Sequence, residues 1–298
     1  MVTVQPITPD FAAEVGDVDL GKPLSPDDLT AVREAFTKFA VLVFPDQGFD
    51  DDSQLAFARH FGPLETTVFK LRKENKLRLH ENLADVSNLG NDDKILETND
   101  RLRLYNLGNR LWHTDSSFKR IPAYCSMLHA RSIPPIGGQT EFADLRAAYD
   151  ALSEETKRRI TGLVAEHSLM TSRARLGFSD FDETERKAFD PVPQVLARRL
   201  PDSGRMSLYL ASHAGAIRGM PQAEAEALLK ELIEHSTQRR FVYSHRWRVR
   251  DLVIWDDRCT MHRGMEFDDQ RYKRDMRRAT VSDVAPTCEQ MGLAVAAE

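Results

Sequence analysis

Short apolar stretches of β-strand length recur along most of this chain and limit the folds open to it. The strand candidates are Ala40 to Phe44, Tyr124 to Ala130, Thr140 to Ala143, Met206 to Leu210, Arg240 to Ser244, Asp251 to Trp255 and Met276 to Val281. Helical spacing of apolar residues occurs over Ser25 to Phe39, where Ser25 suits the cap, and over Asp51 to Phe61 and Pro221 to His235. With no internal repeat and no low-complexity linker, the pattern predicts one mainly β domain over residues 1–298, a sandwich or barrel with helical insertions.

The segment from residue 69 to residue 111 breaks this pattern. It is polar, charged and only weakly periodic, which is typical of a long loop rather than of a packed element. Loops on a rigid scaffold often carry binding residues. We therefore expect residues 69–111 to form a lid, called the predicted lid below.

Charge and cysteine content exclude several classes of partner. Lys and Arg total 41 against 46 Asp and Glu, and the net charge of -5 gives no general attraction to nucleic acid or anionic lipid. The start MVTVQPITPD has neither a basic nor an apolar leader region, and no stretch has the length of a membrane span. Cys125, Cys259 and Cys288 are widely spaced, which argues against a zinc ribbon and favours structural thiols. We expect a cytoplasmic protein that binds neither nucleic acid nor a membrane.

A metal site is suggested by the segment LWHTDS. His113 and Asp115 are two residues apart, so an extended chain directs both side chains to the same face. His262 follows a distant apolar strand and offers a third ligand. Two histidines and one carboxylate leave open positions on the metal, as non-haem Fe(II) oxygenases require for a chelating cosubstrate and O2. A His-x-Asp pair alone is weak evidence, because most histidines are exposed or satisfied in a core.

Support comes from Arg274 and Arg278, which lie four residues apart in the last predicted strand and share one face of it. Two guanidinium groups on one face can grip a carboxylate through charge-assisted hydrogen bonds. Arg277 should point to the opposite face. A solvated basic edge strand is the alternative interpretation. The presence of His262 upstream favours anion binding.

Several motifs together resemble those of the taurine dioxygenase family, and the whole chain is most similar to its 2,4-dichlorophenoxyacetate dioxygenase branch. The motifs are FGPLE at Phe61 to Glu65, NRLWHTDSSF at Asn109 to Phe118, GGQTEFADLRAAYDAL at Gly137 to Leu152, DLVIWDDRCTMHRG at Asp251 to Gly264 and RRATV at Arg277 to Val281. The resemblance implies a double-stranded β-helix, a cupin-like jelly roll, with Fe(II) and the cosubstrate 2-oxoglutarate between its sheets.

The resemblance also implies roles for individual residues. His113, Asp115 and His262 match the iron ligands, which are the catalytic centre, whereas Thr140 and Arg274 match residues that bind the distal carboxylate of 2-oxoglutarate.

For the substrate, Arg278 matches the residue that meets its anionic end, and Asn109 and Lys70 are weaker candidates. Lys70 is equally well explained as a solvated lysine. Trp255 fits core packing, and Asp257 stands where relatives often carry Asn.

The implied reaction uses O2 to hydroxylate a small anionic organic substrate, with succinate and CO2 as coproducts. An aryloxyacetate such as 2,4-dichlorophenoxyacetate would give a phenol and glyoxylate. The alternatives are a taurine, alkylsulfonate or alkyl sulfate dioxygenase and, in other classes, a zinc hydrolase or a non-catalytic metal-binding jelly-roll module. A passive metal site has no use for Arg274 and Arg278, which favours an enzyme. Relatives are commonly oligomers, so we expect a homo-oligomer.

Overall fold

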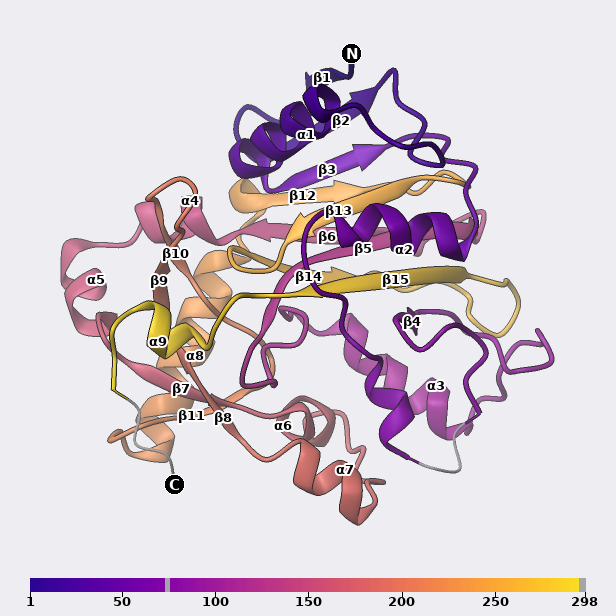
Figure 1. Cartoon of the computed structure of the whole chain (residues 1–298). Helices are drawn as coiled ribbons and strands as arrows, with labels where there is room; N and C mark the ends of the chain where they lie inside the picture. The colour runs from indigo at the N-terminus through magenta and orange to yellow at the C-terminus, as the bar shows by residue number, and fades with distance from the viewer. Residues whose placement is uncertain (73–75, 295–298) are drawn as a thin grey trace.

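Two β layers face each other at the centre of the fold (Figure 1), in a computed structural model that describes residues 1–72 and 76–294. The larger layer contains, in spatial order, β1 (Thr3–Pro6), β2 (Ala12–Gly16), β3 (Val41–Phe44), β13 (Leu252–Asp256), β5 (Ala123–Ser132), β15 (Asp275–Ser282) and β4 (Leu83–Asp85). Its strands pair antiparallel except for β2 and β3. The opposite layer contains three smaller groups: β12 (Val242–His245), β6 (Thr140–Asp144) and β14 (Thr260–Gly264); β11 (Ala214–Ile217), β7 (Val164–His167) and β8 (Val192–Val195); and β10 (Met206–Leu208) with β9 (Ala197–Arg199).

Successive side chains along the strands of the larger layer point alternately to its outer face and to its inner face. Leu42 of β3 and Ile254 of β13 pack in a cluster with the helices α1 (Pro26–Phe39) and α2 (Asp51–Arg59) on the outer side. Val43 and Val253 face the other way and pack with Phe142 of β6 in the opposite layer. Side chains one residue apart on a strand point to opposite faces, so this register places the inward residues between the layers. The expected mainly β, cupin-like jelly roll is confirmed.

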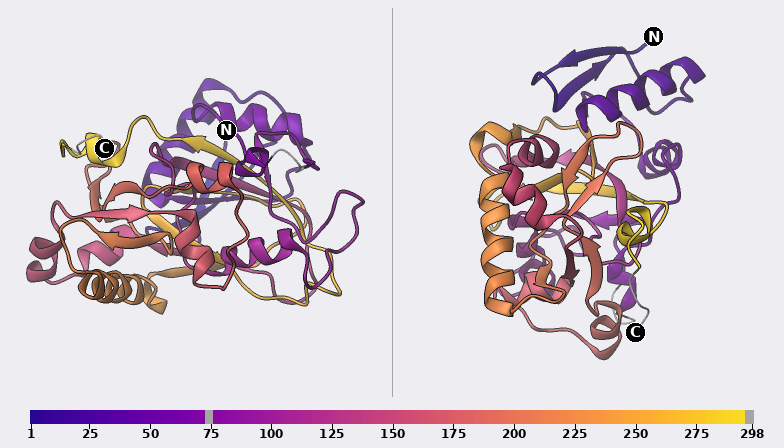
Figure 2. Two further views of the ribbon diagram at one scale, coloured as in Figure 1. Left: turned by 90° about the horizontal axis from the view of Figure 1, so that it is seen from below. Right: turned by 90° about the vertical axis from the view of Figure 1, so that its left-hand side faces the viewer.

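Helices cover the outer faces of both layers (Figure 2). Ser25 caps α1 (Pro26–Phe39) by accepting a hydrogen bond from the Asp28 backbone N–H, as the sequence predicted. Leu228 and Leu232 of α8 (Gln222–Ser236) pack against the smaller layer. The other helices are α2 (Asp51–Arg59), α3 (Arg101–Asn106), α4 (Leu145–Asp150), α5 (Glu154–Ile160), α6 (Leu169–Ala174), α7 (Glu183–Ala188), α9 (Thr287–Gln290) and the 3-10 turns η1 (Val68–Leu71), η2 (Leu107–Arg110) and η3 (Arg239–Phe241).

The structure differs from the sequence expectation in two regions. The strand expected over Arg240 to Ser244 begins at Val242, because Arg240 and Phe241 belong to η3. The predicted lid contains η1, β4, α3 and η2 rather than a continuous loop. Residues 73–75 of the predicted lid lie outside the described residues, and its role as a lid stays a prediction.

All three cysteines are buried and free, as expected for structural thiols. Within residues 1–72 and 76–294, the helices are too short or too polar for any of them to cross a bilayer.

Candidate functional site

His113 and His262 are held together by their own backbones. His113 follows η2, and its N–H donates to the His262 carbonyl at 3.0 Å, while the His262 N–H donates to the His113 carbonyl at 2.8 Å. His262 comes just beyond the apolar strand β13, as the sequence had suggested, and itself lies within β14. This reciprocal pair brings the two imidazole rings to 4.2 Å between centroids.

Asp115 joins this pair because the intervening residue turns away. Thr114 directs its hydroxyl to the carbonyls of Leu210 and Thr260, so Asp115 and His113 share the opposite face. His113 Nε2 lies 3.8 Å from Asp115 Oδ1, and His262 Nε2 lies 3.7 Å from Asp115 Oδ2. All three side chains are buried, and their candidate ligand atoms lie within 4.8 Å of one another.

The hydrogen bonds leave metal-binding atoms free. His113 Nδ1 donates to the Leu111 carbonyl at 2.7 Å, which leaves the Nε2 lone pair directed at Asp115. Asp115 Oδ2 is buried without a hydrogen-bond partner among the described residues. Buried polar atoms are normally satisfied, so a cation between these groups fits the site.

Electrostatics favour the protonation states that metal binding requires. Burial lowers the pKa of His113, and burial together with repulsion from His113 holds the pKa of His262 well below its usual value. Both imidazoles are therefore neutral near pH 7. Burial, the largest single influence, acts to raise the pKa of Asp115, but the charge of Arg278 together with smaller contributions from His262, His113 and Ser126 outweighs it, so the net pKa is lowered. Asp115 is ionised.

Two cavities meet at this cluster. We call the first the Arg274 cavity; it has a volume of about 110 Å³ and is lined by Arg274, Thr140, Trp255, Leu128 and His262, among others. Arg274 is 8% exposed and forms no ion pair within the described residues. Burial lowers the pKa of Arg274 to about 10, so it remains charged at neutral pH. A buried guanidinium without a counterion suits an anionic ligand in this cavity.

Thr140 stands at the start of β6, where a double-glycine turn leads into the strand. Gly137 has φ of +79°, and a Cβ there would lie 2.4 Å from the Glu266 carbonyl oxygen, so only glycine fits. Thr140 Oγ1 accepts a hydrogen bond of 3.0 Å from Trp247 Nε1. Because indole is only a donor, the Thr140 hydroxyl proton is free for an acceptor elsewhere, including one in the Arg274 cavity.

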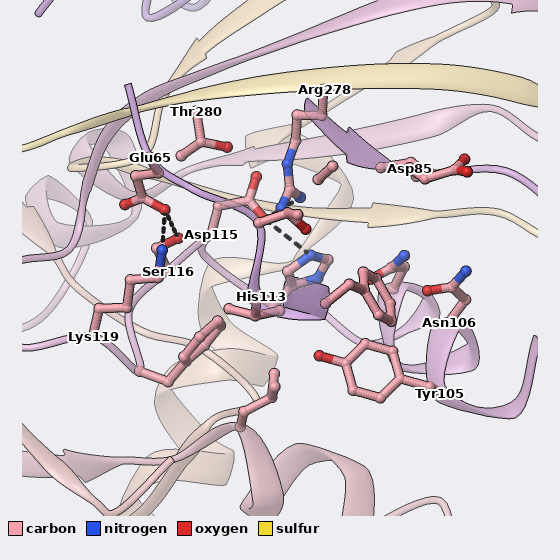
Figure 3. A pocket seen from close by; sticks show the side chains of 18 of the residues that line it. Glu65, Asp85, Tyr105, Asn106, His113, Asp115, Ser116, Lys119, Arg278 and Thr280 are labelled. Atoms are coloured by element: carbon pink, nitrogen blue, oxygen red, sulfur yellow. Dashed lines mark hydrogen bonds and ion pairs between the residues drawn. The ribbon is translucent and has the colours of Figure 1, made fainter. Parts of the chain in front are cut away.

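The second cavity, which we call the Tyr105 cavity, has a volume of about 80 Å³ and lies on the other side of the cluster. Figure 3 shows Arg278 reaching from β15 toward Asp115 and His113, with Tyr105 beside them. Arg278 Nη1 pairs with Asp115 Oδ1. Arg278, Asn109 and His113 line both cavities, so they connect the two.

Two other predicted positions lie outside both cavities. Lys70 is on η1, is half exposed and pairs with Glu81, so this conformation does not bring it to the site. Arg277 points to the outer face, as expected, and pairs with Asp51 of α2.

Asp257 also lies apart from both cavities, although it is close to the cluster. Its Oδ1 accepts hydrogen bonds from the Asp115 N–H at 3.1 Å and from Trp255 Nε1 at 3.0 Å. Burial and the charge of Asp115 raise the pKa of Asp257 well above its usual value. Asp257 therefore supports the backbone of Asp115 rather than facing a ligand.

Sequence reasoning missed three residues at the site. His213 lines the Tyr105 cavity with its ring 6.0 Å from that of His113. Arg173 of α6 lines the same cavity, and Trp247 supports Thr140. Only tertiary folding brings these residues to the cluster. The local sequence signal for Arg173 was its place in LMTSRA, a short segment of mostly apolar and small residues in which an arginine is unusual.

Comparisons with known proteins agree with this geometry. Residues 3–280 match the family described as "Taurine catabolism dioxygenase TauD, TfdA family". The alpha-ketoglutarate-dependent 2,4-dichlorophenoxyacetate dioxygenase of Cupriavidus pinatubonensis is 44% identical over 95% of this chain and 99% of its own length. The crystal structure of AAD-2 in complex with Mn(II) and N-oxalylglycine is 49% identical, covers 96% of this chain and 98% of its own, and superposes with a TM-score of 0.88. An alpha-ketoglutarate-dependent sulfate ester dioxygenase of Pseudomonas putida is more distant, at 27% identity over 95% of this chain and 90% of its own length.

Proposed function

The chain belongs to the TauD/TfdA dioxygenase family, and from this premise we propose that it is an Fe(II) enzyme that cleaves an aryloxyacetate such as 2,4-dichlorophenoxyacetate. It is a 2-oxoglutarate-dependent dioxygenase, and therefore an oxidoreductase. The observation that carries the proposal is the buried His113, Asp115 and His262 cluster placed between two cavities, one of which holds the uncompensated charge of Arg274.

In the proposed enzyme, His113, Asp115 and His262 hold Fe(II), and their two neutral imidazoles and one carboxylate leave it a net positive charge. Bound Fe(II) supplies O2 activation coupled to the oxidative decarboxylation of 2-oxoglutarate. Arg274 pairs with the distal carboxylate of the cosubstrate, and Thr140 donates a hydrogen bond to it. These contacts fix the cosubstrate in the Arg274 cavity.

The primary substrate occupies the Tyr105 cavity, where Arg278 meets its carboxylate and Asn109 lies at the border between the cavities. Holding the carboxylate there places the adjoining methylene next to the metal cluster. Hydroxylation of that methylene gives a hemiacetal, which breaks down to a phenol and glyoxylate, while one 2-oxoglutarate and one O2 yield succinate and CO2.

Turnover of candidate acids tests this proposal. Protein purified without oxygen is mixed with Fe(II), ascorbate, 2-oxoglutarate and O2, and succinate is measured with 2,4-dichlorophenoxyacetate, taurine, an alkyl sulfate and cinnamate-like acids. Phenol and succinate released in equal amounts would support an aryloxyacetate enzyme. Sulfite or sulfate release would favour the sulfonate or alkyl sulfate alternative, and metal binding without any succinate would favour the non-catalytic module.

His113→Ala is the matched control, because it removes one ligand while Asp115 and His262 stay in place. We expect its succinate formation to fall by about a thousandfold or more, since loss of a ligand disrupts metal binding and O2 chemistry together. Metal content measured on the same samples separates loss of the ion from loss of the fold. A variant as active as the wild type would remove His113 from the proposed centre.

Several coarser expectations accompany this function. A small organic substrate is supported by the relatives, and no nucleic-acid partner is expected from the charge balance. The single domain, the cytoplasmic location and the homo-oligomeric assembly stay predictions.

A further inference from the structure

Buried arginines divide into two groups in this molecule. Of the five buried arginines within residues 1–72 and 76–294, three pair with aspartates: Arg146 with Asp144 at 2.9 Å, Arg198 with Asp283 at 2.9 Å and Arg258 with Asp256 at 2.8 Å. The other two, Arg274 and Arg173, form no ion pair with any described residue. Each of them lines one of the two cavities that meet at the metal cluster. The position of Arg173 thus parallels that of Arg274.

The surroundings of Arg173 are aromatic and, among the described residues, offer it no carboxylate as an ion-pair partner. Its side chain is 4% exposed, and its guanidinium carbon lies 4.5 Å from the centre of the Tyr105 ring. Nη1 donates to Ser172 Oγ at 3.1 Å, whereas Nε is buried without a partner. A Cβ at Gly108 would lie 2.2 Å from this guanidinium, so glycine at that position makes room for it. Burial and the nearby charge of Arg278 contribute to a lowered pKa of Arg173.

The other charged groups of the Tyr105 cavity are already balanced. Lys119 pairs with Glu65 at 2.6 Å. Asp85 pairs with Arg78 at 2.7 Å, outside the cavity, and Asp115 faces Arg278 and the metal position. Arg173 is therefore the positive charge in this cavity that the described residues leave uncompensated. Burying such a charge costs free energy unless a ligand supplies the counterion.

We propose that Arg173 is a second cationic contact for the carboxylate of the primary substrate, which binds between Arg173 and Arg278 in the Tyr105 cavity. The proposal rests on the proposed function and adds a specificity-determining residue to it. An anion placed there removes the repulsion between the two guanidinium groups and pairs with both. Arg173 consequently selects acids over neutral molecules of the same shape.

The competing interpretation is that Arg173 only packs. Its guanidinium stacks on Tyr105 of α3 and touches Gly108 of η2, so it holds these elements against α6. Arg173→Met retains an apolar chain of similar length, and Arg173→Lys retains the charge with a different shape. Packing alone predicts that Met substitutes well and that the charge of the ligand does not matter.

Arg175, the residue that caps the C-terminal end of α6, offers a matched control. It is exposed, its Nη2 donates to the Ala214 carbonyl at 2.8 Å, and it does not line the cavity. Arg175→Met thus removes the same charge from nearly the same place in the chain without altering the proposed contact.

The test measures binding to the protein loaded with Mn(II) and 2-oxoglutarate without O2. Calorimetric titration gives Kd for 2,4-dichlorophenoxyacetate and for its neutral amide, and a separate titration gives Kd for 2-oxoglutarate. We expect Arg173→Met to raise Kd for the acid by about 10- to 100-fold, the range of a buried charge-assisted contact. Amide and 2-oxoglutarate binding should stay as in the wild type, Arg173→Lys should keep most of the acid affinity, and Arg175→Met should match the wild type.

The proposal is overturned if Arg173→Met raises Kd for the acid and for the amide by the same factor, or changes neither Kd. Wild-type protein that binds no aryloxyacetate would overturn this proposal and the proposed substrate together. Wild-type protein that binds the acid but forms neither phenol nor succinate would overturn the proposed function alone, because the binding comparison still decides the role of Arg173.

Discussion

At the scale of single residues, Trp247 is the clearest positioning residue of the proposed cosubstrate site. Its Nε1 donates to Thr140 Oγ1 at 3.0 Å, and this fixes the direction in which the Thr140 hydroxyl donates. We predict that Trp247→Phe raises KM for 2-oxoglutarate about 3- to 10-fold, the effect of losing a hydrogen bond worth roughly 1 kcal/mol. KM for the aryloxyacetate should not change.

A double-mutant cycle checks whether Trp247 acts through Thr140. In a Thr140→Val background the indole has no hydroxyl to orient, so Trp247→Phe should add no further effect on 2-oxoglutarate binding. Additive losses would mean that Trp247 supports the cavity by packing alone.

His129 gives a prediction about stability rather than activity. Its Nε2 donates to the Gln47 carbonyl at 2.8 Å, Nδ1 is buried without a partner, and burial lowers its pKa to about 4. The unfolded chain titrates near the ordinary histidine value of about 6.5. Below that pH the His129 imidazole is protonated in the unfolded state but stays neutral in the folded state. The free energy of unfolding therefore falls as pH drops from about 6.5 toward 4.

The expected size is about 2 kcal/mol of lost unfolding free energy at pH 5, relative to pH 7.5, from this residue alone. Urea unfolding of the wild type and of His129→Gln at both pH values measures it, because glutamine retains a donor for Gln47 but does not titrate. Parallel pH dependence in the two proteins would show that His129 is not the source.

At the scale of elements, strands and long helices followed from local pattern, whereas the short helices did not. Alternation along β3 and β13 and the Ser25 cap of α1 are local features that any compact fold would use. By contrast, α6 and α7 have six residues each, too few for helical periodicity to be recognised. Their stability comes from packing and capping, which a single sequence does not display.

One such packed contact joins the predicted lid to α7. Glu185 is buried and accepts hydrogen bonds from Arg101 Nη2 at 3.0 Å, and Arg101 Nε donates to Asp180 at 2.8 Å. Glu185 also completes the capping box of α7 with Asp182. Glu185→Gln preserves that cap, because glutamine also fits this motif, but removes the charge that holds Arg101.

We predict faster hydrogen exchange over Arg101–Asn106 in Glu185→Gln and a several-fold rise in KM for the aryloxyacetate, since Tyr105 of this helix lines the Tyr105 cavity, the proposed substrate site. KM for 2-oxoglutarate should be nearly unchanged. Glu154→Gln, which alters an exposed ion pair on α5, is the control. Unchanged exchange in both variants would argue against a role of this contact in holding the predicted lid.

At the scale of the whole molecule, the candidate site combines predictable and unpredictable parts. His113 with Asp115, and Arg274 with Arg278, were found because each pair is close in sequence and shares a strand-like face. Arg173 was not found, because its position depends on how α6 packs beside the cluster. Local pattern therefore indicated one of the two arginines proposed to contact the substrate, Arg278, whereas Arg173 reaches the site only through long-range packing.

The same long-range assembly predicts that metal and cosubstrate stabilise the entire fold. His113 and Asp115 follow η2, His262 lies on β14 in one layer, and Arg274 adjoins β15 in the other. The unfolded chain does not hold these groups together, so we expect Mn(II) and N-oxalylglycine to bind the native state alone. Each ligand at 100 times its Kd then adds about 2.7 kcal/mol, which should raise Tm by about 4 °C per ligand in a chain of this length.

Thermal melts with Mn(II), with Mn(II) and N-oxalylglycine, and after EDTA treatment measure this stabilisation. His113→Ala should lose the shift caused by Mn(II), because its metal centre lacks one ligand. Arg274→Met should keep the Mn(II) shift and lose most of the further shift caused by N-oxalylglycine, because only the carboxylate clamp is gone. An equal N-oxalylglycine shift in Arg274→Met and wild type would place that acid outside the Arg274 cavity.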